Sequence, residues 1–168
     1  ERGKGFIIAV NKWDLIEKNN SSVNEFTKKI RSTLSFMPYA EIMFSRMFVE
    51  TPDNNFVTSI LFVPENYDEF NKMMTLEPTH NNQNNINEGF WITNSYEEFY
   101  KPGDNETISL RNLAGTRVED VPNGYFTNYL TNYHIVMDKA TYEENFNEEV
   151  KYNAYIVSTF NTNIDTLI

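Results

Sequence analysis

The chain has 168 residues, enough for one ordinary domain or two small ones, and carries a net charge of −10. Residues 1–46 hold 8 basic and 5 acidic residues, whereas residues 47–168 hold 6 basic and 19 acidic residues. The acidic part argues against contacts with nucleic acid or anionic lipid, and the absence of cysteine excludes disulfides and thiol chemistry. No apolar run approaches ~18 residues, so we expect no membrane-spanning segment in this sequence.

The first predicted element is a buried strand that ends at a polar tetrapeptide. The apolar run Phe6–Val10 is typical of a strand covered on both faces, as in a parallel sheet. Ligands of open α/β sheets bind beyond the carboxyl ends of such strands, where Asn11, Lys12 and Asp14 follow. The Asp14 carboxylate can accept two N–H hydrogen bonds from guanine. The aliphatic stem of Lys12 can lie over the base plane, and the Asn11 amide can form hydrogen bonds that connect neighbouring loops. Turns and helix caps share this Asn-x-x-Asp spacing, so the pattern alone leaves both interpretations open.

A helix and a second strand are predicted next. Ser22-x-x-Glu25 is a capping box, and apolar residues at helical spacing predict a helix from about Val23 to Leu34. The segment Ala40–Phe44 then predicts a short strand. Together these elements make a β-α-β unit, which favours a parallel pair of strands.

The first 45 residues contain several motifs around this unit. They are Gly3-Lys4-Gly5, Phe6–Val10, Asn11-Lys12-Trp13-Asp14-Leu15-Ile16-Glu17-Lys18, Asn24-Glu25-Phe26-Thr27-Lys28-Lys29-Ile30 and Phe36-Met37-Pro38-Tyr39-Ala40. In these motifs residues 1–45 resemble the second GTPase domain of the bacterial ribosome-assembly GTPase Der. The resemblance implies that Asn11, Lys12 and Asp14 recognise the guanine of GTP or GDP. It also implies a cytoplasmic location for this part of the chain.

The phosphate-binding and metal-binding parts of a GTPase are missing from the sequence. No Gly-x-x-x-x-Gly-Lys-Ser/Thr loop occurs, and no Asp-x-x-Gly stretch precedes the first strand. After the second strand, Ser45-Arg46 stands in place of the family's Ser-Ala pair, and the resemblance stops there. Because phosphoryl transfer depends on positioning and charge stabilisation by those parts, we expect no GTP hydrolysis and no bound cofactor.

The abrupt change in charge predicts two parts of different origin, 1–46 and 47–168. In the second part, turn chemistry at Thr51–Asn55 precedes a β-rich run at Phe56–Val63. The polar, asparagine-rich segment Thr75–Glu88 is typical of a loop. Helices are expected within Glu65–Met74, at Ser95–Tyr100 with Ser95 and Glu98 as a capping box, and at Lys139–Phe146. Further strands are expected at Gly89–Thr93, Glu106–Leu110, Arg117–Val121, Tyr133–Met137 and Tyr152–Thr159.

Two histidines and three pairs of neighbouring acids are the remaining candidates for chemistry. His80 lies in a predicted loop without a second His or Cys nearby, so we expect no metal site there. His134 lies in a predicted strand, where a packed or half-exposed side chain is expected. Neighbouring acids point to opposite faces of a strand or lie ~100° apart on a helix, which favours solvated surface over acid–base catalysis. The pairs are Glu97/Glu98, Glu119/Asp120 and Glu143/Glu144.

The order of elements in the second part carries a resemblance of its own. A strand at Phe90–Thr93 and a short helix at Glu97–Tyr100 lead to Lys101-Pro102-Gly103-Asp104 and a strand at Thr107–Leu110. Another strand, an Asp and a helix follow in Tyr133–Tyr142. In this order residues 56–159 resemble the extracytoplasmic domain of FtsX/MacB-like ABC transporter permeases. The resemblance implies a non-catalytic binding or scaffold domain outside the membrane, with a protein or peptide as its partner.

The two resemblances imply different compartments, so three interpretations stay open. The chain is a permease-like binding domain with an incomplete GTPase fragment at its start, as in a composite or engineered reading frame. Alternatively, it is a guanine-nucleotide-binding fragment of Der, or a single α+β domain of unrelated activity whose halves share one core. The predicted fold class is α+β or mixed α/β, with a short N-terminal β-α-β unit followed by a mixed-sheet domain with short helices.

Overall fold

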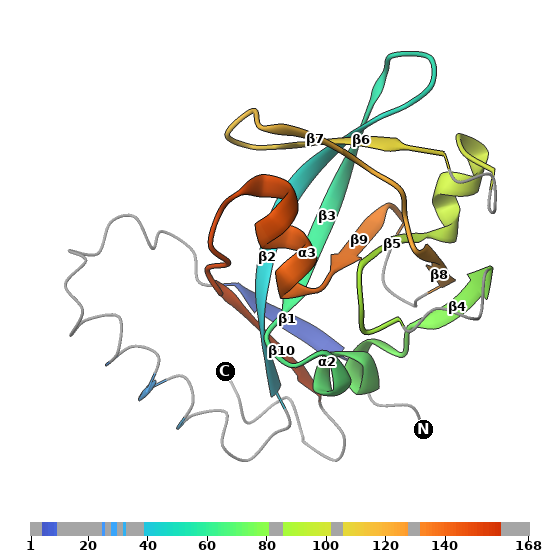
Figure 1. The fold of residues 1–168 in the computed structure, drawn as a ribbon. Coiled ribbons are helices and arrows are strands. Elements are labelled where there is room, and N and C mark those ends of the chain that lie inside the picture. The colour runs from blue at the N-terminus through green and yellow to red at the C-terminus, as the bar shows by residue number, and fades with distance from the viewer. Residues whose placement is uncertain are drawn as a thin grey trace.

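The computed structural model describes residues 5–9, 25, 28, 29, 32, 39–80, 86–101, 106–127 and 132–158. Within them, ten strands form one mixed sheet in which β1, β10, β2, β3, β9, β5, β8 and β4 follow one another (Figure 1). The strands β6 and β7 branch from β2. This arrangement, with short helices packed on it, confirms the predicted α+β class.

A long two-stranded ribbon organises the sheet. β2 (Tyr39–Glu50) and β3 (Phe56–Pro64) pair antiparallel, from Ile42 opposite Pro64 to Glu50 opposite Phe56. The connecting turn places Asn54 at φ 62°, and its N–H donates to the Thr51 carbonyl at 2.9 Å. The predicted turn and the predicted strand at 56–63 are therefore confirmed. The second strand is longer than the predicted Ala40–Phe44, since it continues unbroken through residues 45–50.

Strand β2 has different neighbours along one of its sides. Residues 39–42 pair with β10 (Ala154–Ser158), and residues 47–50 pair with β6 (Ile108–Asn112), which in turn pairs with β7 (Arg117–Asp120). β2 carries the chain across residue 46, where the charge changes sign. Both parts of the chain therefore contribute strands to one sheet.

The first strand, β1 (Gly5–Ala9), pairs antiparallel with β10 and not with β2. Because β10 is also antiparallel to β2, it lies between the two strands that the sequence placed in a parallel β-α-β unit. β1 and β2 therefore run in the same direction but do not pair with each other, so the prediction of a parallel pair is wrong. Of the predicted helix at 23–34, residues 25, 28, 29 and 32 are helical and exposed, and the rest lies outside the described residues.

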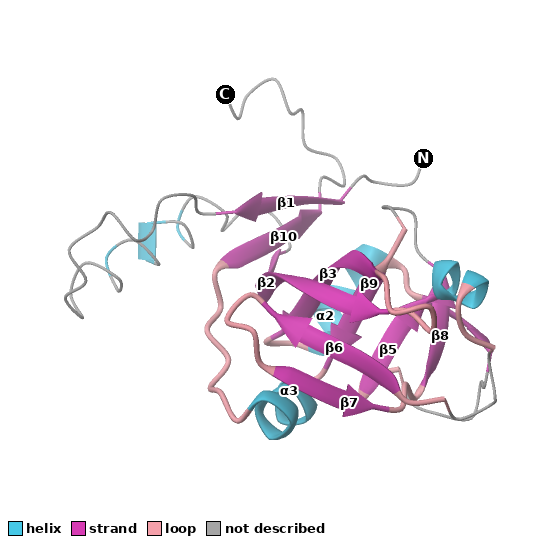
Figure 2. Cartoon of the chain, turned by 90° about the horizontal axis from the view of Figure 1, so that it is seen from above, coloured by secondary structure: helices cyan, strands magenta, loops and turns pink. Residues whose placement is uncertain are grey.

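The other half of the sheet continues from β3 through four strands. β9 (His134–Met137) pairs parallel with β3, and β5 (Phe90–Thr93) pairs antiparallel with β9. β8 (Gly124–Thr127) pairs parallel with β5, and β4 (Glu77–His80) pairs antiparallel with β8. Figure 2 shows β1 and β10 on the opposite side of the molecule from β5 and β8.

Two local predictions fail in this half. β4 lies inside the segment predicted as a loop, because pairing with β8 orders a segment that includes Glu77 and Pro78, residue types of low β propensity. The residues at 94–98 form the 3₁₀ helix η2 (Asn94–Glu98), but Ser95 does not cap it. The Ser95 hydroxyl instead contacts Thr93 Oγ1 at 2.8 Å and accepts the Tyr133 N–H at 2.9 Å, which ties η2 to the start of β9.

The helices α2 and α3 are short and begin at capping side chains. α2 (Tyr67–Met74) begins after Asn66, whose Oδ1 accepts the Glu69 N–H at 3.1 Å. α3 (Lys139–Phe146) begins after Asp138, whose Oδ1 accepts the Thr141 N–H at 2.9 Å. These helices confirm the predictions for both segments. None of the helices in the described residues has the length and apolar character of a membrane span.

The helices cover opposite faces of the sheet and bury two apolar clusters. One cluster gathers the inward side chains of β2, β3 and β6 with Tyr142 and Phe146 of α3. The other packs Ile42 and Phe62 against Phe70 of α2. Position 124 beside this second cluster has room only for glycine, because a Cβ there would lie 2.5 Å from the Trp91 ring. The alternation of side chains along β2 and β3 therefore divides one sheet into two cores.

Asp138 also joins the start of α3 to the start of β5. Its Oδ2 accepts the Thr141 hydroxyl at 2.8 Å and the Gly89 N–H, and the Asp138 N–H donates to the Gly89 carbonyl at 3.1 Å. Gly89 has φ +80°, and a Cβ there would collide with the Asn123 side chain. Burial raises the pKa of the Asp138 carboxyl, but the hydrogen bonds from Thr141 and Gly89 outweigh it, so the pKa lies below its ordinary value.

Candidate functional site

The predicted guanine-binding residues, Asn11, Lys12 and Asp14, lie outside the described residues. Strand β1 ends just before them, at Ala9, which pairs with Ala154 at the beginning of the antiparallel strand β10. The argument from the carboxyl edge of a parallel sheet therefore does not apply here, because β10, the strand that pairs with β1, is antiparallel to it. Guanine binding by these residues stays a prediction that depends on the resemblance to Der.

An exposed sheet surface lies at the other end of the ribbon, where the β2–β3 turn and the β6–β7 hairpin lie at the top of Figure 1. The strand order here is β3, β2, β6 and β7, and side chains at alternate positions point to the face that α3 does not cover. We call this surface the open face. It consists of Arg46, Phe48, Glu50, Phe56, Thr58, Ser109, Arg111, Arg117 and Glu119.

One half of the open face is a network around Arg117. Its Nη2 lies 3.2 Å from Glu50 Oε2 and 3.1 Å from Glu119 Oε1, and its Nε donates to Ser109 Oγ at 2.7 Å. The Arg117 charge is therefore matched by two carboxylates. Such a solvent-exposed network contributes little to stability, about 1 kcal/mol or less for each pair.

A shallow cavity of about 450 Å³ lies beside this network. The Tyr100 hydroxyl donates to the Glu50 carbonyl within it, and burial, together with Glu106 and Glu50, raises the pKa of Tyr100. A tyrosine with a raised pKa stays protonated and serves as a hydrogen-bond donor. Most of the lining residues have polar side chains, which could contact a polar group: Glu50, Thr51, Pro52, Asn54, Tyr100, Glu106, Thr107, Ser109, Arg117 and Glu119.

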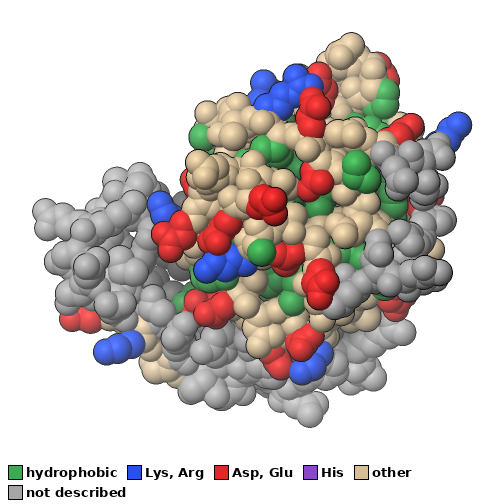
Figure 3. Space-filling model, viewed as in Figure 1, with side chains coloured by type: hydrophobic (Ala, Val, Ile, Leu, Met, Phe, Trp, Pro, Cys, Tyr) green, Lys and Arg blue, Asp and Glu red, His purple; other side chains and the backbone are tan. Residues whose placement is uncertain are grey.

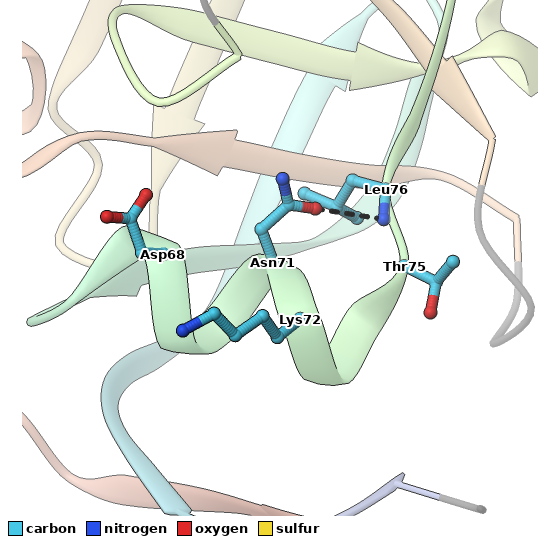
Figure 4. Close-up of a pocket in the computed structure, with 5 residues that line it drawn as sticks. All are labelled: Asp68, Asn71, Lys72, Thr75 and Leu76. Carbon is cyan, nitrogen blue, oxygen red and sulfur yellow. Dashed lines mark hydrogen bonds between the residues drawn. The ribbon is translucent and has the colours of Figure 1, made fainter.

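A second cavity, of about 410 Å³, lies along α2 (Figure 4). Asn71 points toward the end of the helix, where its Oδ1 accepts the Leu76 N–H at 3.1 Å. Lys72 donates to Glu69 at 2.8 Å, which raises the pKa of Lys72. Asn71 thus closes the helix at Thr75, which has a left-handed conformation, and Lys72 pairs with Glu69 on the helix surface. We therefore assign these side chains to the helix and not to a ligand site.

The buried polar side chains of the sheet also serve the fold. His134 is 1% exposed and packs edge-on against Phe62, with ring centroids 5.4 Å apart. Burial lowers the pKa of His134 to about 4, so the ring is neutral at pH 7. Ser59 and the Tyr96 hydroxyl share a buried hydrogen bond. Among the described residues, no group of three or more His, Cys, Asp or Glu side chains is placed to hold a metal ion.

The acid pairs do not form a catalytic site in the part of the chain that the structure describes. Glu97 and Glu98 are both exposed, and Glu144 is exposed beside the half-buried Glu143. Glu119 is engaged with Arg117, whereas the Asp120 carboxylate accepts a bond from the Asn145 side chain at 2.7 Å. Sequence reasoning missed the open face. The alternation Phe44-x-Arg46-x-Phe48 between buried methionines and Val49 was the signal that could have found it.

Comparisons with known sequences match only part of the chain. A segment is 70% identical over 44 residues to GTPase Der of Agathobacter rectalis, covering 26% of this chain and 10% of that protein. A segment is 43% identical over 76 residues to GTPase Der of Thermoanaerobacter sp. strain X514, covering 45% of this chain and 16% of that protein. The chain therefore spans a tenth to a sixth of the length of these relatives. No family model matches the chain.

Comparisons with solved structures cover nearly all of the chain. The extracellular domain of the ABC-type transporter YknZ from Gram-positive bacteria superimposes with a TM-score of 0.53 at 7% identity, over 99% of this chain and 88% of that chain. The periplasmic region of MacB from Actinobacillus actinomycetemcomitans gives a TM-score of 0.51 at 9% identity, over 97% and 77%. The protein therefore has the fold of the periplasmic region of MacB and the extracellular domain of YknZ, and a short segment of it is similar to GTPase Der.

Proposed function

We propose that the protein is a non-catalytic binding or scaffold domain, of the kind that ABC transporter permeases present outside the membrane. The observation that carries this proposal is the fold, which matches the YknZ extracellular domain over 99% of this chain. By contrast, the segment of highest identity to Der covers 26% of the chain. We assign to this chain the role of holding a protein or peptide partner.

The arrangement of polar groups supports a binding role. The Ser59 and Tyr96 hydroxyls share a hydrogen bond and His134 packs against Phe62, while the Asp138 carboxylate is held by backbone and hydroxyl donors. The open face, in contrast, presents charged and aromatic side chains to solvent on four adjacent strands. A rigid sheet surface of this kind suits recognition of a partner protein. We place the domain outside the cytoplasm on the same argument from fold.

The alternative function is guanine-nucleotide binding by Asn11, Lys12 and Asp14, as a fragment of Der. The 70% identity over 44 residues favours it, but the missing phosphate loop argues against it. The β- and γ-phosphate contacts supply much of the positioning in such sites, and nothing in this sequence replaces the loop that makes them. GTP or GDP would be a ligand only in this alternative.

Calorimetry with GDP and a phosphate-release assay with GTP separate the two functions. We expect no phosphate release and no Kd tighter than ~100 μM, because base contacts alone supply too little affinity. Asp14→Ala should therefore change nothing, and Lys18→Ala provides a matched control in the same segment. Tight GDP binding or phosphate release that Asp14→Ala abolishes and Lys18→Ala leaves intact would establish the alternative.

A further inference from the structure

The second half of the open face is a cluster of arginine and phenylalanine side chains. The Arg111 guanidinium carbon lies 4.5 Å from the centroid of the Phe56 ring and 5.8 Å from that of Phe48. Phe48 and Arg111 are direct cross-strand neighbours on β2 and β6. Phe56 is 48% exposed, so its large apolar ring stays in contact with water and does not fill a core. We call Arg46, Phe48, Phe56 and Arg111 the arginine–phenylalanine cluster.

The two arginines of the cluster are not neutralised. Arg46 lies two residues before Phe48 on the same face of β2, and both arginines are exposed. Within the described parts of the chain, neither forms an ion pair with a carboxylate, whereas Arg117 contacts Glu50 and Glu119. Figure 3 shows basic side chains gathered over β6 and β7 with acidic side chains directly beside them, and acidic side chains dominate the rest of that view. The cluster is thus a cationic spot on a chain of net charge −10.

The chemistry of these side chains defines what would bind. A guanidinium can hold a carboxylate through two parallel N–H bonds, and an arginine already stacked on a ring loses less freedom when it does so. Exposed phenylalanines beside it offer contact area for an apolar side chain. Arginine and aromatic side chains are also the residues that most often supply binding energy at protein interfaces.

We propose that the arginine–phenylalanine cluster is the docking site for an acidic segment of a partner protein, in which carboxylates alternate with apolar or aromatic side chains. This inference rests on the proposed binding function and names the class of partner. Charge complementarity supports it, since the carboxylates would meet Arg46 and Arg111 while the apolar side chains contact Phe48 and Phe56. A segment without carboxylates would leave both arginines unmatched.

An anionic membrane fits the same surface less well. Binding to anionic lipid through charge takes clusters of roughly four to eight basic residues. The cluster has two, and residues 47–168 as a whole hold 19 acidic residues against 6 basic ones. An extended anionic surface would therefore be repelled by the acidic part of the chain, whereas a short acidic segment contacts only the cationic spot.

Fluorescence anisotropy with a labelled synthetic peptide tests the proposal. The probe is a ten-residue peptide in which Asp alternates with Phe and Leu, and the control peptide has Lys in place of each Asp. We expect the acidic probe to bind the full chain, its affinity to fall as salt rises, and the Lys peptide not to bind. Arg111→Gln should weaken binding by about tenfold or more, and Arg46→Gln by a smaller factor.

Matched variants separate a site from a general charge effect. Lys151→Gln removes one exposed positive charge that lies outside the cluster and should leave the affinity unchanged. Arg111→Lys keeps the charge but not the planar fork, so its affinity should fall between those of Arg111→Gln and the unmodified protein. Circular dichroism melts confirm that each variant is folded, and Arg46→Gln provides a second test if Arg111→Gln does not fold.

Several outcomes would overturn the proposal. They are equal binding of the acidic and Lys peptides, equal loss with Lys151→Gln and Arg111→Gln, or no binding of the acidic probe. Arg111-dependent sedimentation with phosphatidylglycerol vesicles would assign the cluster to lipid, and Arg111-dependent dimerisation in analytical ultracentrifugation would assign it to a second copy of the chain. None of these results would restore GDP binding, so the proposed function is judged separately by the nucleotide assays.

Discussion

The same face of the same two strands is buried at one end and open at the other. At the buried end, Ile42 and Phe62 are 0% and 1% exposed beneath α2. At the open end, Phe48 is half-buried and Phe56 is 48% exposed beside Arg111. The strands and their register continue without a break between the two ends.

The difference lies in what covers the strands and not in the strands themselves. Phenylalanines occur at both ends, so apolar content alone does not distinguish core from surface. Under α2 the phenylalanines exclude water and stabilise the fold. Near the turn, the phenylalanine rings contact the Arg111 guanidinium and are partly exposed. We infer that the buried end supplies most of the stability of this domain and that the open end binds its partner.

The largest effect on stability is expected for Phe62→Ala at the buried end. Phe62 packs against Phe44, Phe70 and His134, with ring centroids 5.4–5.8 Å apart. Its truncation should lower the free energy of unfolding by about 3–5 kcal/mol, because it leaves a cavity beneath α2. Urea unfolding followed by circular dichroism measures the change. A loss below about 1 kcal/mol would mean that this end does not carry the stability.

A smaller effect is expected on acidification, because His134 is buried at the same end. Its pKa is about 4 in the folded state against 6.5 for the free side chain, so between these values the unfolded chain binds the additional proton. Stability should therefore fall as pH drops from 6.5 to 4, by at most about 3 kcal/mol. His134→Gln should flatten the curve in this window. An unchanged slope in the variant would show that other groups cause the loss.

Asp138→Ala tests the joint between α3 and β5, with an expected loss of about 2 kcal/mol. The substitution removes the helix cap and the acceptor of the Gly89 N–H. Since the folded-state pKa of Asp138 lies below its ordinary value, its contribution is present near neutral pH and disappears as the carboxyl is protonated in acid. Thermal melts at pH 7 and in acid should differ less for the variant than for the unmodified protein.

Phe56→Ala at the open end should have the smallest effect on stability, about 0.5 kcal/mol or less. The half-exposed ring contacts Arg111 without filling a core, so its loss affects the surface only. The same variant should weaken binding of the acidic peptide. If Phe56→Ala and Phe62→Ala destabilised the protein equally, the division between a stabilising end and a recognition end would be wrong.

Local sequence patterns were sufficient for much of the fold. The turn at Thr51–Asn55, the strand after it and the helix Lys139–Phe146 follow from turn chemistry, alternation and capping, all of which act over a few residues. β8 was missed because its four residues follow a turn signal and include Gly124, whose fit depends on the distant Trp91 ring. β4 was missed because its strand conformation depends on that same β8.

The candidate site was less accessible to sequence reasoning. The open face brings together residues from four strands, and Arg111 meets Phe56 only because β6 pairs with the far end of β2. No spacing in the sequence encodes that pairing. The residues predicted to bind guanine, by contrast, lie in a contiguous tetrapeptide that is visible in the sequence, although β1 pairs antiparallel.

The position of β10 between β1 and β2 has a consequence for synthesis. β1 is made first among the described strands, and β10, the strand beside it, is made last. While the nascent chain emerges, residues 5–9 have to wait until residue 158 has left the ribosome before they can join the sheet. The ribbon of β2 and β3 can form long before then, so we expect the long-range pairing of β1 with β10 to form late in folding.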